Sequence, residues 1–304
     1  MEVIGIAMAT YNGAKYIEEM LDSIAAQSYK FFIIHICDDG STDDTINLIK
    51  SHYLYINGKI IIHSQEGGNG AYKNFKRTLS FCNEKYISLC DQDDYWHKDK
   101  LRILLAEIKN RENSSFDKPV LIYSDLEIVN DKLEVLNSSF YDNSMKSSTA
   151  VKPQDFIVSN HIPGCAMFFN HALKKIFEPM PDAIRMHDWW ICLVAASFGE
   201  IKFVNYKLIK YRQHSNNTVG APGILKGSKS IYTIKSMLGL WRVLSRSRSF
   251  RFELIKKIRA MPNIYYDDNT RRLLRLNIFD RIYFMYSSKS GEISLLAFTI
   301  WLFL

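Results

Sequence analysis

The stretch Tyr86-Ile87-Ser88-Leu89-Cys90-Asp91-Gln92-Asp93-Asp94-Tyr95-Trp96 decides the fold that the sequence predicts. Its short apolar start predicts a buried strand, and three carboxylates follow within four residues. Open α/β sheets bind ligands beyond the carboxyl ends of their strands, so we expect a ligand near these acids. Clustered carboxylates repel one another unless a cation lies between them, and hard oxygen ligands suit Mg²⁺ or Mn²⁺. The alternative is an acidic turn that caps a helix starting near His97.

Strands alternate with helices on the N-terminal side of this stretch. Residues 3–9 and 32–37 are short apolar runs, and each is followed by a polar turn and then by helical spacing of apolar residues. Residues 59–63 predict another buried strand, and 72–83 predict a helix. This alternation predicts an α/β fold whose mostly parallel sheet is covered by helices on both faces.

Five motifs then occur in an order that is typical of one enzyme family. They are Ala9-Thr10-Tyr11-Asn12-Gly13, Asp38-Asp39-Gly40-Ser41, Asp91-Gln92-Asp93-Asp94, His187-Asp188-Trp189-Trp190 and Tyr211-Arg212-Gln213-His214. Over residues 1–220 the chain resembles the inverting glycosyltransferases of family 2, which have the Rossmann-like GT-A fold. Among these it is similar to bacterial rhamnosyltransferases of surface-polysaccharide and O-antigen assembly.

The resemblance implies a metal-dependent transfer with inversion at the anomeric carbon. It favours L-rhamnose, taken from dTDP-rhamnose, as the sugar and a lipid-linked saccharide as the acceptor. One alternative is a UDP-hexose donor in the same fold. The other is a protein that binds nucleotide sugars without catalysis, which would not need a base at Asp188 in addition to the acidic run.

The resemblance assigns the donor nucleotide to Thr10, Tyr11, Asn12 and Asp39, and it places Asp91 against the ribose or the metal. A carboxylate can accept the N3–H of uracil or thymine while a tyrosine packs against the base, so these residue types suit a pyrimidine. For the acidic loop after the second strand, a plain turn with the N-cap of the next helix is the structural alternative.

The resemblance also assigns the metal and the base. Asp93 is the expected direct ligand of Mg²⁺ or Mn²⁺, with Asp91 and His214 as further contacts; imidazole favours Mn²⁺ over Mg²⁺. Asp188 is the expected catalytic base, because partial desolvation beside two indoles raises a carboxyl pKa toward a useful value. An N-cap of the following helix is the alternative for Asp188.

Four residues are assigned to the sugar and the acceptor: Gly164, Trp189, Trp190 and Arg212. Glycine lets the backbone approach a ligand closely. Flat aromatic rings stack on the apolar faces of sugars, which suggests an acceptor platform at the two tryptophans. Core packing is the alternative for Trp190.

Composition and charge divide the 304 residues into a GT-A domain, 1–220, and a C-terminal region, 221–304. The five cysteines form no C-x-x-C pair, which suits the reducing cytoplasm and argues against a zinc site built from thiolates. In the C-terminal region Lys and Arg outnumber Asp and Glu by fifteen to five. No nucleic-acid motif accompanies this charge, so we expect no nucleic-acid partner.

The basic residues of region 221–304 are mixed with Trp, Phe and Leu, which predicts helices lying on the anionic inner face of the cell membrane. The apolar run 293–304 would be only about 18 Å long as a helix, too short for a hydrocarbon core of about 30 Å. We therefore expect peripheral attachment. An ordinary helical subdomain and an oligomer contact are the alternatives.

Truncation after Leu225 is expected to release the protein from anionic vesicles while nucleotide binding is retained. Each basic residue near an anionic leaflet contributes about 1 kcal/mol, and the first 220 residues carry a small net negative charge. Co-sedimentation of both forms with vesicles measures this. If the full-length form does not sediment with the vesicles, or if the truncated form still does, the C-terminal region is a structural or oligomeric element and the membrane prediction is wrong.

Overall fold

The computed structural model describes residues 1–65, 67–112, 118–142, 148–156, 160–182, 184, 186–214, 253 and 256. The predicted boundary loop, 216–228, and all but two residues of the predicted region 221–304 lie outside this part of the chain. Within the described residues, no helix combines the length and the hydropathy that crossing a membrane requires.

The N-terminal half consists of β-α units, as the sequence predicts. Its elements are β1 (Ile4–Thr10), α1 (Ile17–Ala25), β2 (Phe32–Asp38), α2 (Thr45–Ser51), α3 (Tyr53–Ile56), β3 (Ile60–Ser64), α4 (Gly70–Phe81) and β4 (Tyr86–Asp91). The C-terminal half contains β5 (Tyr95–Trp96), α5 (Lys100–Glu112), β6 (Val120–Val129), β7 (Val135–Asn137), the 3₁₀ turns η1 (Pro153–Phe156) and η2 (Gly164–Ala166), β8 (Met167–Asn170), α6 (His171–Phe177), α7 (His187–Phe198) and β9 (Glu200–Arg212).

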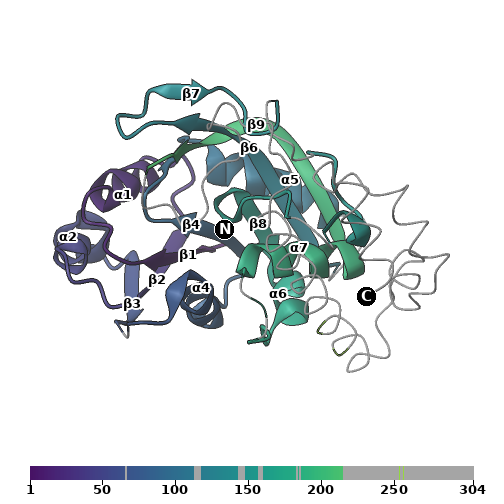
Figure 1. The fold of residues 1–304 in the computed structure, drawn as a ribbon, viewed down its shortest axis with the longest axis horizontal. Coiled ribbons are helices and arrows are strands. Elements are labelled where there is room, and N and C mark those ends of the chain that lie inside the picture. The colour runs from purple at the N-terminus through teal and green to yellow at the C-terminus, as the bar shows by residue number, and fades with distance from the viewer. Residues whose placement is uncertain are drawn as a thin grey trace, which may run out of the picture.

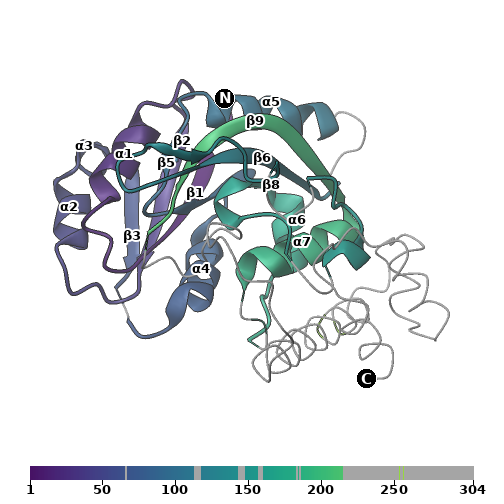
Figure 2. The ribbon, with the colours of Figure 1, turned by 45° about the horizontal axis from the view of Figure 1, so that its top comes forward.

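One twisted sheet joins these strands in the order β3-β2-β1-β4-β8-β6-β9-β5, with β7 paired to β6 (Figure 1). β3, β2, β1 and β4 are parallel, β8 lies antiparallel between β4 and β6, and β9 is parallel to β6. In Figure 2, α5 lies above the sheet, and α4, α6 and α7 lie below it. The predicted α/β fold with helices on both faces is confirmed.

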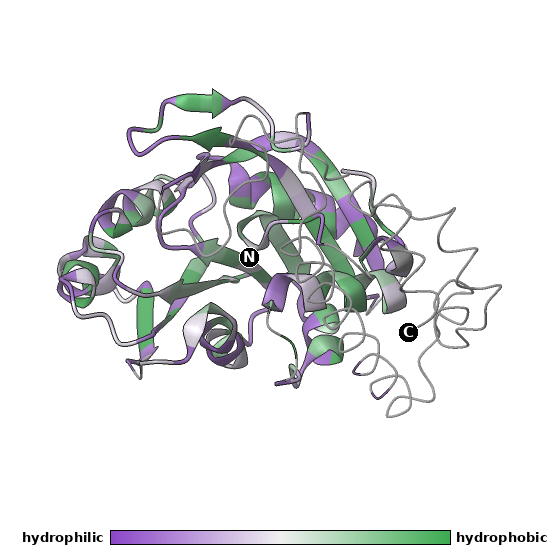
Figure 3. Ribbon diagram, viewed as in Figure 1, coloured by the Kyte–Doolittle hydropathy of each residue, from purple (hydrophilic) through white to green (hydrophobic). Residues whose placement is uncertain are grey.

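Coverage on both faces explains the composition of the central strands. Every residue of β1 except Ala9, and every residue of β4 except Asp91, is buried. A strand covered on both sides has no solvent-facing positions, so its sequence is apolar throughout and does not alternate. Figure 3 shows this in the hydrophobic colour of β1 and β4, whereas α1, α2 and α4 also carry hydrophilic residues.

The parallel register brings the loops after three strands to one edge of the sheet. Thr10 at the end of β1 pairs with Asp38 at the end of β2, and Ala9 pairs with Asp91 at the end of β4. Three of the predicted motifs begin at these carboxyl ends. The site is therefore positioned by the backbone of the most buried strands of the fold.

Candidate functional site

The acidic run forms the turn between β4 and β5, where it meets the end of β9. His214 Nε2 lies 2.9 Å from Asp93 Oδ2, although the two residues are 121 positions apart. The His214 ring stacks on Tyr16, with 5.0 Å between the ring centroids. These contacts bring together two of the predicted metal ligands and fix the imidazole plane beside the carboxylate.

A buried lysine lies behind the acidic run. Lys100, in the first turn of α5, has no exposed surface; its Nζ donates a hydrogen bond of 3.0 Å to the Cys165 carbonyl and lies over the Trp96 ring. Burial lowers the pKa of Lys100 to about 8, while Cys90, Cys165 and the carboxylates of Asp94 and Asp91 act in the opposite direction. The sequence gives no sign of this internal cation, because nothing in a Lys-Asp-Lys segment distinguishes a buried lysine from an exposed one.

The carboxylates are strongly perturbed. Burial, the neighbouring Asp93 and Asp188 raise the pKa of Asp91 to about 7. Burial, Asp93 and Asp91 raise the pKa of Asp94 well above its usual range. Asp188 lies in α7, close enough to the acidic run for its charge to raise the pKa of Asp91.

The acidic run offers carboxylate oxygens that fit a divalent cation. Asp94 Oδ1 accepts the Arg212 backbone N–H at 3.2 Å, but its buried Oδ2 has no hydrogen-bond partner within the described residues. Asp91, Asp94 and Cys165 also offer ligand atoms that all lie within 4.8 Å of one another. Hard ions prefer oxygen ligands to a cysteine sulfur, so the two carboxylates are the better ligands here for Mg²⁺ or Mn²⁺.

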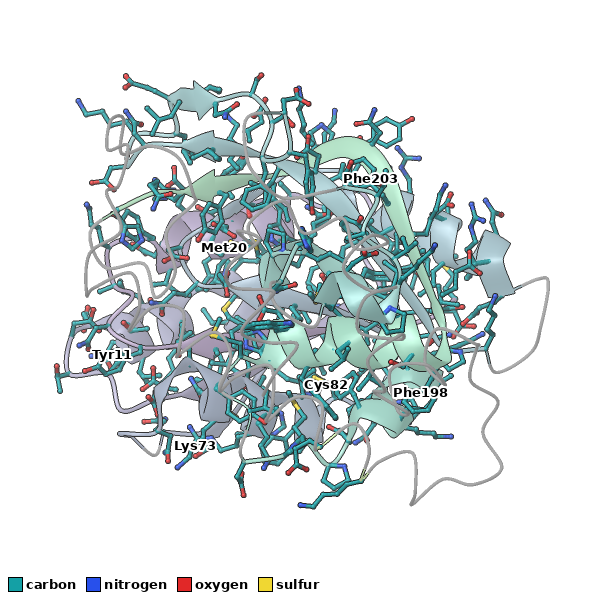
Figure 4. The ribbon with its side chains drawn as sticks, turned by 45° about the vertical axis from the view of Figure 1, so that its right-hand side comes forward. Tyr11, Met20, Lys73, Cys82, Phe198 and Phe203 are labelled. Carbon is teal, nitrogen blue, oxygen red and sulfur yellow. The ribbon has the colours of Figure 1, made fainter. Side chains whose placement is uncertain are left out.

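The loop after β1 is fastened to the acidic run by a glutamine. Gln92 accepts a hydrogen bond from the Tyr11 backbone N–H at 2.9 Å and donates one to the Tyr11 carbonyl at 2.8 Å. A Cβ added to Gly13 would lie 2.3 Å from Gln92 Oε1, so a larger residue there would displace the glutamine from Tyr11. The Tyr11 side chain is left 55% exposed, and it projects from the edge of the molecule in Figure 4, where a base could stack on it.

The polar residues on either side of Tyr11 join the loops after β1 and β2. The Thr10 hydroxyl donates a hydrogen bond to Asp38 Oδ2, and the Asn12 side-chain oxygen accepts one from the Thr42 backbone N–H. The Asn12 backbone N–H donates in turn to the Ser41 hydroxyl. Thr10 and Asn12 therefore shape the predicted nucleotide loop.

The two acids after β2 have different environments. Asp38 accepts hydrogen bonds from the Thr10 hydroxyl, from the Ser41 hydroxyl and from two backbone N–H groups of its own turn. Among the residues that the structure describes, Asp39 accepts hydrogen bonds from the backbone N–H groups of Asn69 and Gly70, at the start of α4. Each carboxylate oxygen can accept two hydrogen bonds, so Asp39 keeps more capacity for a ligand than Asp38 does.

Asp188 lies in the first turn of α7, and Met186 occupies the N-cap position. Its Oδ1 accepts the Trp189 backbone N–H at 2.7 Å, and its Oδ2 accepts Asn160 Nδ2–H at 2.8 Å. A Cβ added to Gly164 would lie 3.1 Å from His187 Nε2 and 3.4 Å from Asp188 Cβ, so Gly164 lets the start of α7 pack closely; its contact with a sugar stays a prediction. Asn160 orients the carboxylate, and no sequence pattern had indicated it.

Three residues predicted to contact the sugar or the acceptor are buried instead. The Trp190 ring has no exposed surface and its Nε1–H donates to the Phe177 carbonyl, as the core-packing alternative requires. Trp189 is 5% exposed and donates to the Phe156 carbonyl. Arg212 is 1% exposed and donates to the Asp93 carbonyl at 2.8 Å, so it fixes the acidic turn. A buried ring or guanidinium offers no face to a sugar.

Comparison with known proteins identifies a family for most of the chain. The family model described as "Glycosyl transferase family 2" matches residues 5–177. The dTDP-rhamnosyl transferase RfbG of Shigella flexneri is 31% identical over 226 residues, which cover 70% of this chain and 74% of that protein. The amylovoran biosynthesis glycosyltransferase AmsB of Erwinia amylovora is 34% identical over 212 residues, or 66% of this chain and 65% of AmsB. The chain spans only 59% of other curated relatives from mycobacteria.

Solved structures share the fold at low sequence identity. TarS 1–349 of S. aureus in complex with UDP-GlcNAc matches with a TM-score of 0.58 at 17% identity, covering 99% of this chain and 78% of that chain. The mannosyltransferase PcManGT of Pyrobaculum calidifontis in complex with GDP-Man and Mn²⁺ has a TM-score of 0.51 at 14% identity, covering 98% and 78% of the two chains. At such identities the likeness shows the fold alone.

The raised pKa of Asp91 gives a stability prediction for the metal-free protein. Because the folded state holds this proton more tightly than the unfolded state, the carboxyl costs stability as pH rises from about 4 to about 7. Asp91→Asn removes that cost, so in EDTA the variant should melt several degrees above wild type at pH 8 and close to it at pH 4.5, at about 2 to 4 °C for each kcal/mol. The exposed Asp22→Asn is the control. If the melting temperatures of wild type and Asp91→Asn differ by the same amount at every pH from 4.5 to 8, the pKa of Asp91 is not raised in the folded state.

Proposed function

The chain belongs to glycosyltransferase family 2, and on this premise we propose that it transfers L-rhamnose from dTDP-rhamnose to a saccharide acceptor with inversion, using Mg²⁺ or Mn²⁺. The observation that carries the proposal is the convergence of Asp91, Asp93 and His214 at the carboxyl end of β4, with Asp188 near them. A protein that only binds nucleotide sugars does not need the Asp188 carboxylate in addition to the acidic run. The name of the relative RfbG supports the choice of donor.

Each requirement of the transfer has a candidate residue. Tyr11 supplies an exposed ring for the base, and Asp39 supplies a carboxylate for a pyrimidine N3–H. A divalent cation held by Asp93, Asp91 and His214 would neutralise the charge of the leaving diphosphate. Arg212 holds the acidic turn through its hydrogen bond to the Asp93 carbonyl, and Lys100 adds a buried positive charge near Asp94 and Asp91.

Asp188 acts as the base in this proposal. Its Oδ2 accepts the proton of the acceptor hydroxyl while that oxygen bonds to the anomeric carbon and the bond from this carbon to the diphosphate oxygen breaks. Asn160 and the Trp189 backbone N–H hold the carboxylate in one orientation. A single displacement of this kind inverts the anomeric configuration.

The acceptor and the location are part of the proposal. The relative AmsB is named for biosynthesis of the polysaccharide amylovoran, which supports a saccharide acceptor in surface-polysaccharide assembly. The basic composition of residues 221–304 supports peripheral attachment to the cytoplasmic face of the membrane, where a lipid-linked acceptor would be presented.

The donor and the metal can be tested together. In the presence of Mn²⁺, dTDP-rhamnose should raise the melting temperature more than UDP-glucose or UDP-GlcNAc does, and EDTA should remove the metal-dependent part of the shift and abolish transfer. With Mn²⁺ present, Asp93→Ala should lack both transfer and the metal-dependent thermal shift, as wild type does in EDTA. The control Asp22→Ala, at an exposed position, should keep both. Transfer that persists in excess EDTA would contradict the proposed metal dependence. A larger rise in melting temperature with a UDP-hexose would show that the UDP-hexose, and not dTDP-rhamnose, is the donor.

The base can be tested by Asp188→Asn. We expect kcat to fall by about 10²- to 10⁴-fold, because proton abstraction is lost, while the thermal shift with donor and Mn²⁺ is retained. Asp182→Asn, an exposed acid just before α7, is the matched control. NMR of the wild-type product from dTDP-β-L-rhamnose should show an α-linkage; a retained β-configuration would rule out single displacement.

A further inference from the structure

A second group of metal-ligating side chains lies under the C-terminal end of α4. His35 of β2 contributes an imidazole, and Cys82 and Glu84 come from the turn between α4 and β4. One ligand atom from each lies within 4.8 Å of the others. Cys82 has no exposed surface, and the side chains of His35 and Glu84 are 6% and 16% exposed. We propose that His35, Cys82 and Glu84 bind a Zn²⁺-like transition-metal ion at a site separate from the catalytic cation.

The donor set selects the class of metal. Thiolate, imidazole and carboxylate are the protein ligands of Zn²⁺, whereas Mg²⁺ and Mn²⁺ prefer sites made of oxygen. A thiolate, a carboxylate and a neutral imidazole also balance the charge of a divalent cation. A neutral complex lowers the cost of burial, which is large for an isolated charge. Binding releases the proton of the Cys82 thiol to solvent.

The surroundings of His35 resemble those of a metal-bound histidine. Its Nε2 lies 3.0 Å from Glu84 Oε1, and its Nδ1 lies 2.8 Å from His63 Nε2. When Nδ1–H donates to His63, Nε2 is left as a lone pair aimed at the cluster, which is the usual way in which a second residue orients a ligating imidazole. The His63 ring is itself stacked on Phe81, with 4.0 Å between centroids.

Glu84 supplies a free ligand atom. Its Oε1 faces His35, but Oε2 is buried without a hydrogen-bond partner within the described residues. Gly5 of β1 makes room for this oxygen, because an added Cβ would lie 2.4 Å from it. Bonds of about 2.0 to 2.3 Å put tetrahedral ligands about 3.5 Å apart, so the three atoms would have to approach by roughly 1 Å.

The two metal sites are separated along β4. Glu84 precedes this six-residue strand and Asp91 ends it, so at about 3.3 Å per residue they lie about 20 Å apart. Figure 4 likewise shows Cys82 well away from Tyr11, which marks the nucleotide loop. Occupancy of one site can therefore be measured without the other.

Cobalt provides the test, because a Co²⁺–thiolate bond gives a near-ultraviolet charge-transfer band that oxygen ligands do not produce. Full-length protein freed of metal is titrated with Co²⁺ and then with Zn²⁺. We expect one equivalent of Co²⁺ to produce the band and Zn²⁺ to abolish it. Cys82→Ala should lose the band, and Cys192→Ala, an equally buried cysteine in α7, should keep it. Far-ultraviolet circular dichroism checks that each variant is folded.

Two further variants keep the test decisive. Glu84→Gln preserves shape and should weaken Co²⁺ binding at least tenfold even if Cys82→Ala does not fold. Cys165→Ala removes the thiol beside Asp91 and Asp94 and should leave the band unchanged. Absence of the band in wild type overturns the proposal, as does a band that depends on Cys165 and not on Cys82.

Discussion

Burial of like charges at the end of β4 is the constraint on which the site depends. Asp91 ends a strand that is covered on both faces, and Asp93 and the buried Asp94 follow it, so their repulsion is poorly screened by water. The raised pKa values of Asp91 and Asp94 express that cost. The fold offsets it with Lys100 behind the run and with an Arg212 backbone N–H on Asp94. A bound divalent cation would supply the remaining positive charge.

The part of the site that the sequence predicts is the part set by parallel strands. Because β1, β2 and β4 run in the same direction, their loops had to meet, and the motifs at Thr10, Asp38 and Asp91 could be placed from periodicity alone. The strand β9 and the antiparallel β8 were not predicted in this way. Their pairing is long-range, and only the resemblance indicated that His214 would reach Asp93.

Residue type was a poor guide wherever burial decides the role. Trp189, Trp190 and Arg212 have side chains that often bind sugars, yet the covered interior of the fold encloses all three. Lys100 and Asn160 show the opposite case, since neither has a distinctive sequence context. Lys100 is a buried cation near the acidic run, and Asn160 donates a hydrogen bond to Asp188. Chemical character is visible in a sequence, but solvent exposure emerges only when distant segments pack.

The two proposed cation sites differ in their ligand atoms and in their exposure to substrate. The run at the end of β4 is rich in carboxylates and is hydrogen-bonded to the loop after β1, so it suits an ion that keeps open positions for phosphate oxygens. The His35, Cys82 and Glu84 cluster is enclosed by α4 and β1 and includes a thiol, so it suits a softer ion with protein ligands. Spacing motifs could not indicate this second cluster, because its ligands come from separate segments. A chain without paired cysteines can therefore still assemble a zinc-type donor set through its tertiary structure.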